Sequence, residues 1–330
     1  MCKSLWLLCA SVLFAMPSAQ AVTVSDLYEV SMPVTTNREA AFGDALRAVI
    51  LRVSGRRDAV DRLGSALDNP RGYVQRFGFT ADNVLQVGFD SLSIDRLLSE
   101  AGLPIWGRER PTTVVLLSVE SSDGVPLWMD AVAQGPERDT LMKAAKQRGV
   151  PLVWPAMDAL DRSRAEGVFD SSSAPSLMQI AERYNANAVL LGKARSDGVG
   201  GYYVRWILAT EDGGAETQGT LEEGVHLAAD TFAGIYAASG SSLDSVALEI
   251  SGIENLNAYA ATLNYLENMT VVRNVALEQV AGDTLHFRVA VRGDAAQLKR
   301  ALALDSKLVP LMSGGAPGSS AQRLQFRYRP

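Results

Sequence analysis

Apolar positions along the chain switch between helical and strand spacing in three successive segments. In the first segment, residues 38–53 place apolar side chains at intervals of three and four, which predicts an amphipathic helix. Gly55 follows at the position where helices commonly end. Further helices are predicted over residues 58–67 and 94–101, with strands over 27–33, 73–79, 84–89 and 103–106. This order of elements is typical of a small α+β unit.

The second segment has the pattern of strands that are covered on both faces. Residues 112–119 form a nearly continuous apolar run rich in β-branched side chains, as expected in the middle of a sheet. A helix over 139–148 leads to a strand over 150–155, which predicts a parallel βαβ connection. A helix is predicted over 176–184, a strand over 188–193, and a hairpin of strands over 202–210 and 215–221. The segment therefore predicts an α/β unit with an antiparallel edge.

The third segment returns to a smaller pattern of mixed elements. Its predicted elements are helices over 225–238, 256–268 and 295–303, strands over 246–250, 271–280 and 284–291, and a final edge strand over 322–329. Stretches rich in serine and glycine at 239–242 and 313–320 indicate flexible connections. We predict an α+β or α/β protein with three small mixed sheet-and-helix domains in tandem, at residues 22–110, 111–222 and 223–330, and a first linker at 107–110.

The amino-terminal residues resemble a secretory signal peptide. Lys3 precedes an apolar run over residues 5–16, and small residues lead to Ala21, as in a cleavable leader. The run is shorter than the roughly 20 residues that span a bilayer, so no integral membrane anchor is predicted. We expect cleavage after Ala21 and export of a soluble chain to the periplasm. Because Cys2 and Cys9 lie in this leader, the exported chain is expected to have no disulfide.

Charge and composition exclude several classes of function. The chain has 31 basic and 37 acidic residues, a formal net charge of −6, and no basic cluster of the kind that binds nucleic acid. His226 and His286 are too few for most metal sites. The sequence contains no Gly-x-Ser-x-Gly, Ser-x-x-Lys or His-Glu-x-x-His motif. We therefore predict no cofactor, no metal and no assigned catalytic residue.

An acidic pair is the first candidate site. Asp158 and Asp161, followed by Arg162, come after a predicted strand, at the sheet edge where α/β proteins place ligands. Two close carboxylates can transfer protons or hold a divalent cation. Alternatively, Asp158 caps a short helix and Asp161 or Arg162 forms a local salt bridge.

A second candidate is the stretch over residues 102–108. Trp106 could form an aromatic platform and Arg108 could contact an anion. Alternatively, Trp106 packs between the first two domains, and the neighbouring glycines permit a turn.

Several stretches resemble a known family. They are residues 27–30, 53–58, 102–108, 110–111, 148–152, 183–184 and 190–192, together with Pro155 and Asp158. They are similar to a proteobacterial domain-of-unknown-function family of secreted proteins. In element order the first two segments also resemble the first two domains of a flagellar outer-ring protein, and the second resembles the amino-terminal domain of the Tol-Pal translocation protein and the curli secretion lipoprotein. Such likeness concerns fold and does not transfer an activity.

These observations lead to two hypotheses of function. The first is a non-enzymatic, periplasmic binding or scaffold protein, whose partner is an envelope protein or a cell-wall component. The alternative is an envelope hydrolase, or a binder of a small ligand or divalent cation, that uses Asp158, Asp161 and Arg162. The alternative requires these side chains to converge in one pocket.

Overall fold

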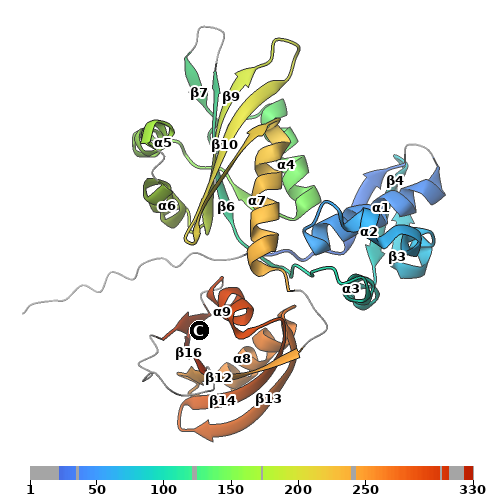
Figure 1. Ribbon diagram of the computed structural model, residues 1–330, viewed down its shortest axis with the longest axis vertical. Helices are drawn as coiled ribbons and strands as arrows, with labels where there is room; N and C mark the ends of the chain where they lie inside the picture. The colour runs from blue at the N-terminus through green and yellow to red at the C-terminus, as the bar shows by residue number, and fades with distance from the viewer. Residues whose placement is uncertain are drawn as a thin grey trace, which may run out of the picture.

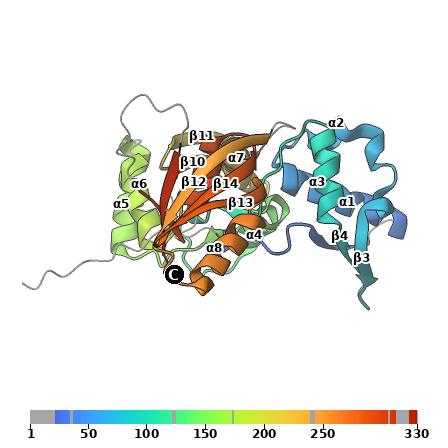
Figure 2. The ribbon, with the colours of Figure 1, turned by 90° about the horizontal axis from the view of Figure 1, so that it is seen from below.

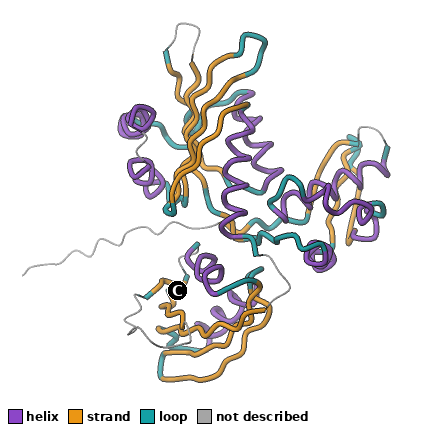
Figure 3. Tube along the Cα trace, in the orientation of Figure 1, coloured by secondary structure: helices purple, strands orange, loops and turns teal. Residues whose placement is uncertain are grey.

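The structure is a computed structural model that describes residues 22–34, 37–120, 125–171, 174–238, 243–304, 307–311 and 323–329. Within these residues, nine helices and four mixed or antiparallel sheets make an α+β protein. Three of the sheets build successive units, each with its own apolar core (Figure 1) (Figure 3). The predicted leader and the flexible stretches at 239–242 and 313–320 lie outside the described residues.

The first unit is a three-stranded antiparallel sheet with helices on one face. Across the sheet, its strands are β2 (Glu29–Pro33), β4 (Val84–Phe89) and β3 (Val74–Phe79). Its helices are α1 (Arg38–Ser54), α2 (Ala59–Leu63) and α3 (Ser91–Glu100). The side chain of Asn37 caps the start of α1, and Gly55 ends it with a φ of 68°, a conformation that glycine adopts without strain. The helix predicted over 58–67 is shorter, because a 3-10 turn (Gly64–Leu67) follows α2.

The second unit is a six-stranded sheet covered on both faces. Its strands are, in order, β11 (Gly213–Gly219), β10 (Tyr202–Thr210), β9 (Ala188–Ser196), β6 (Thr113–Glu120) and β7 (Pro126–Trp128), and β8 (Leu152–Val153) pairs with β6. Helices α4 (Pro136–Arg148) and α7 (Leu221–Tyr236) cover one face, and α5 (Ala159–Ser171) and α6 (Ala174–Arg183) cover the other (Figure 1). Strand β6 is parallel to β8 and β9, and β10 and β11 form the antiparallel hairpin, which confirms the predicted arrangement.

Helix α7 packs on the second sheet, whereas the sequence pattern placed it in the third domain. Its buried side chains, Val225 and Phe232 among them, belong to the core shared with α4 and β10. The indole of Trp206 on β10 lies against Gly192 and Gly224, where a Cβ would come within 2.4 Å of the ring. Glycine at both positions lets the helix and the neighbouring strand approach the indole. The amphipathic pattern of α7 shows that one face is buried but not which sheet buries it. The boundary predicted between the second and third domains was therefore placed before α7 instead of after it.

The third unit is a five-stranded mixed sheet. Its strands are, in order, β13 (Val272–Ala281), β14 (Thr284–Arg292), β12 (Leu243–Ser251), β16 (Arg323–Tyr328) and β15 (Leu308–Pro310). Its helices, α8 (Leu256–Asn268) and α9 (Ala295–Ala303), share its core. Figure 2 shows α8 beside the strands of this sheet. Strand β16 was predicted at the edge, but it lies between β12 and β15 and is parallel to β12. Its alternating side chains, Leu324 and Phe326, are buried in the core that the sheet shares with α8 and α9.

The predicted linker at 107–110 is instead an ordered part of the fold. Its last two residues form β5 (Glu109–Arg110), which pairs with β1 (Val22–Thr23), and the Arg110 side chain is fully buried. The strand predicted over 103–106 is also absent from the described structure, where Ile105 makes a single bridge with Ala238. The backbone N–H of Trp106 donates to the carbonyl of Val53, so this stretch joins α1 and α7 rather than a sheet. None of the described helices combines the length and the apolar character needed to cross a membrane.

Candidate functional site

The predicted acidic pair lies where α5 begins, beside α6. Asp158 accepts hydrogen bonds from the backbone N–H groups of Leu160 and Asp161, as a helix cap does. Both carboxylates bind Arg183, at 2.5 Å for Asp158 and 2.9 Å for Asp161. The hydroxyl of Tyr184 donates to Asp161 at 2.6 Å. Hydrogen bonding from Arg183 holds the pKa of the Asp158 carboxyl well below its usual range.

These contacts hold the start of α5 against the carboxyl end of α6. Asp161 is fully buried, and Arg162 donates through Nε to the carbonyl of Met157 at 2.8 Å. In the part of the chain that the structure describes, no group of three or more His, Cys, Asp or Glu side chains is placed to hold a metal ion. The cleft between the second and third units, described below, is lined by Arg183 but not by Asp158, Asp161 or Arg162. The structure therefore agrees with the alternative in which Asp158 caps a helix and Asp161 forms a salt bridge.

Replacing Asp161 with alanine is expected to lower the free energy of unfolding by about 1–3 kcal/mol, because the hydroxyl of Tyr184 loses its acceptor. Asp158→Ala removes an exposed cap and should lower the melting temperature less. Thermal unfolding checks both variants. Millimolar Mg²⁺ or Ca²⁺ should leave the melting temperature of the wild-type protein unchanged. A cation-induced rise that disappears in Asp161→Ala would show that the pair binds metal.

Trp106 lies at the contact of the first two units, and Arg108 lies beside the ring of Tyr28 in the first unit. Trp106 is 1% exposed and packs against Phe232 of α7, with 6.3 Å between ring centroids. Arg108 lies 5.6 Å from the ring of Tyr28. The hydroxyl of Tyr28 donates to Asp95 at 2.8 Å. The predicted aromatic platform is therefore wrong, because the indole has no open face.

Three buried arginines, Arg52, Arg110 and Arg148, connect the first two units, and we call them the arginine junction. Arg110 donates to the carbonyls of Arg52, Trp106 and Gly107, and its guanidinium lies 3.5 Å from the centroid of the indole. Arg148 donates to the carbonyl of Gly55 at 2.9 Å. The carbonyls of Arg52 and Gly55 lie at the carboxyl end of α1, whose dipole is negative there. Helix α1 of the first unit is thus capped by cations from the adjoining segment and from α4.

Acidic side chains of α7 complete this contact. Asp230 accepts from Arg148 at 2.6 Å and pairs with Arg57 at 3.1 Å, and Glu223 also pairs with Arg57. His226 accepts a hydrogen bond through Nδ1 from Arg148 at 3.0 Å, because a guanidinium can only donate. Burial, followed by the positive charges of Arg148 and Arg57, lowers the pKa of His226.

Stability is expected to fall as the pH drops through about 6.5, the usual pKa of an unfolded histidine. The folded protein, with its lowered His226 pKa, binds this proton less readily than the unfolded chain, so acid favours unfolding. His226→Gln can accept the same hydrogen bond without titrating. Melting temperatures measured between about pH 7.5 and 5.5 should fall more for wild type than for this variant. Equal falls would assign the pH dependence to other groups.

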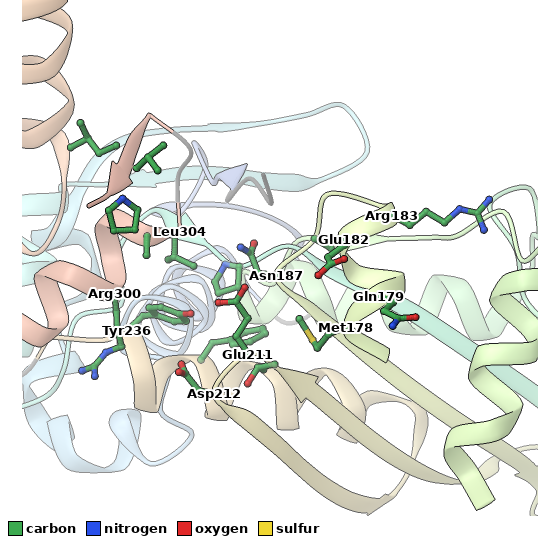
Figure 4. Close-up of a pocket in the computed structure, with 18 of the residues that line it drawn as sticks. Met178, Gln179, Glu182, Arg183, Asn187, Glu211, Asp212, Tyr236, Arg300 and Leu304 are labelled. Carbon is green, nitrogen blue, oxygen red and sulfur yellow. The ribbon is translucent and has the colours of Figure 1, made fainter. Parts of the chain in front are cut away.

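A cleft of about 800 Å³ lies between the second and third units. Figure 4 shows its labelled residues. One wall comes from α6, the residues after it and the tip of the β10–β11 hairpin, and the other from α9 and β15. Tyr236 of α7, which is partly exposed, contributes aromatic surface. Its charged lining residues are Arg164, Glu182, Arg183, Glu211, Asp212 and Arg300.

Comparison with known proteins bears on the first unit. Residues 21–107 match a domain of unknown function, DUF8605. The match covers the three-stranded sheet, its helices and the segment that carries Trp106. No protein with a curated description matches the chain. The predicted resemblance to a domain of unknown function is thus confirmed for this segment. The matching family has no known function.

The residues that line the cleft were not predicted as a site. Glu211 and Asp212 were assigned to a hairpin turn, where acidic residues are ordinary turn formers. Tyr236 and Arg300 lie on amphipathic helices whose pattern indicates only which face is buried. No local signal marks these positions, because the cleft forms only when α6, α7 and α9 come together.

Proposed function

We propose that the protein is a non-enzymatic binding or scaffold protein of the cell envelope, and that its partner binds in the cleft between the second and third units. The observation that carries the proposal is the cleft itself. Its volume of about 800 Å³ lies within the range of ligand sites. Apolar residues from both units line it together with six charged side chains, a mixture that favours recognition of another molecule.

Two features of the lining support binding rather than catalysis. Among the described residues that line the cleft there is no histidine or cysteine, the most versatile side chains for proton transfer and nucleophilic attack. Arg183, at one end, is engaged by Asp158 and Asp161. The sequence also lacks the common hydrolase motifs. These observations favour the scaffold hypothesis over the envelope hydrolase.

The envelope location rests on the sequence. The predicted leader directs the chain to the periplasm, and the resemblance to a secreted family and to flagellar outer-ring and Tol-Pal translocation proteins points to the same compartment. An envelope protein or a cell-wall component is then the proposed partner.

Export predicts a defined amino terminus. Intact-mass analysis of the protein from the periplasmic fraction should give a chain that begins at Val22, and reductant should leave its melting temperature unchanged, because Cys2 and Cys9 are removed. A retained leader or an attached acyl chain would contradict the proposed processing.

Site-specific crosslinking in the cells that produce the protein tests the cleft. A photoreactive amino acid replaces Gln179, an exposed residue of the cleft wall. The control replaces Val132, which is 80% exposed in a loop of the same unit and is not among the lining residues. We expect an envelope component to crosslink from position 179 and not from position 132. Equal labelling from both positions, or none from either, would reject the cleft as the binding site.

A further inference from the structure

We propose that the cleft binds an extended polypeptide segment of the partner through a positively charged side chain; this inference rests on the proposed function of the cleft. Three properties of the lining carry it. They are a set of unpaired carboxylates, an arginine side chain without an ion pair, and apolar surface on both walls. Each property requires a different chemical group of the occupant.

The carboxylates of Glu182, Glu211 and Asp212 are available to a cation. They lie between Arg183 and Arg300 in the view of Figure 4. Within the described residues, none of these three side chains forms an ion pair or a hydrogen bond. Arg183 is held instead by Asp158 and Asp161. A lysine or arginine side chain that enters the cleft therefore does not have to displace an internal partner.

Tyr236 lies near charges of both signs, since Asp212 and Glu211 are negative and Arg300 is positive. Burial, then the negative charges of Asp212 and Glu211, raise the pKa of Tyr236 to about 12. The charges that disfavour a phenolate at this position attract a cation to it. The aromatic ring adds to this attraction, because its face is the negative end of a quadrupole.

Arg300 can bind an acceptor. Its side chain lines the cleft and forms no ion pair with a described residue, so its guanidinium can donate to an acceptor in the cleft. A backbone carbonyl of an extended segment would supply an acceptor at this end of the cleft. Arg164 also lines the cleft and forms no ion pair with a described residue. Its guanidinium could donate to a second carbonyl of the same segment.

The apolar lining distinguishes a polypeptide from a small free cation. Met178 on α6 is partly exposed, and Val309 lies on β15 with 39% of its surface exposed. A polypeptide presents apolar side chains, carbonyl acceptors and a cationic side chain within a few residues, as strand-like recognition segments do. A small cation would satisfy the carboxylates alone and leave Arg300 and the apolar walls without contacts.

Synthetic peptides test this inference on the full exported chain. The probes are three mixtures of acetylated and amidated nonapeptides with lysine, norleucine or glutamate at the centre and alanine, leucine, serine or valine elsewhere. Immobilised protein is incubated with each mixture, and the retained peptides are quantified by mass spectrometry. We expect the lysine mixture to be retained about tenfold more than the norleucine mixture, and the glutamate mixture least.

The double variant Glu211→Gln with Asp212→Asn should reduce retention of the lysine mixture to the norleucine level. Asp82→Asn, a matched change in the exposed turn between β3 and β4, should leave retention unchanged, and both variants should keep the wild-type melting curve. Equal retention of all three mixtures, or retention of none, would overturn the inference. Crosslinking from position 179 would decide the proposed function separately, because it does not depend on the chemistry of the occupant.

Discussion

Arg110→Ala is expected to lower the free energy of unfolding by about 3–5 kcal/mol. The side chain is fully buried and donates to three carbonyls, those of Arg52, Trp106 and Gly107. Its removal leaves these acceptors without their donor and leaves a void against the indole of Trp106. Relief of the repulsion from Arg52 and Arg148 offsets part of this loss, so the expected effect is smaller than the sum of the broken contacts.

Urea unfolding measures this effect against two comparison variants. Arg110→Lys keeps a charge but lacks the planar group that stacks on the indole and binds several carbonyls, so it should be intermediate. Arg205→Ala removes an exposed ion pair with Glu216, which is expected to cost less than about 1 kcal/mol. If Arg110→Ala were as stable as Arg205→Ala, the arginine junction could not be what joins the first two units.

Leu46→Ala is expected to cost about 2–5 kcal/mol, because it leaves a cavity in a core that collapses only partly. Leu46 is fully buried in the first core, between α1 and the sheet. The helix is amphipathic enough to suggest a membrane surface, but its polar side mixes acidic Glu39 and Asp44 with Arg47. Interfacial helices are instead rich in lysine and arginine on that side. The variant should therefore lose stability without any change in its association with vesicles.

Chemical denaturation and cosedimentation with anionic vesicles check the two parts of this prediction. Leu92→Ala, at a position of α3 that is 71% exposed, is the matched control and should change stability by no more than about 0.5 kcal/mol. An unaltered unfolding curve for Leu46→Ala together with lost vesicle binding would mean that α1 faces lipid.

The ends of a helix were predicted to the residue where its apolar positions follow a clear helical period and a capping side chain marks its first turn. Helices α8 and α9 begin and end at the predicted positions, since Asn255 and Asp294 cap their first turns. Strands β7 and β15, which have three residues each, are too short for a period to appear. Their strand conformation is imposed by neighbouring strands, so it could not be predicted from local sequence.

The candidate site was predicted less well, because its residues have no local signature. Asp158 and Asp161 were correctly identified as close carboxylates, yet their partner Arg183 lies more than twenty residues away. Arg110 was assigned to a polar linker, since an arginine that is buried by contacts from α1 looks the same in sequence as an exposed one. The cleft forms where the second and third units meet, so the sequence of either unit alone does not predict it.

The position of β16 also has a consequence for the order in which the chain folds. Strand β16 fills the gap between β12 and β15, so the third sheet is complete only when residues up to 328 are available. Contacts over so many residues form slowly, whereas the first sheet closes with partners nearer in sequence. During synthesis from the amino terminus, the first two units can therefore fold while the third still exposes unpaired strands. We expect this last unit to be the part of the newly synthesised chain that is most open to proteases and chaperones.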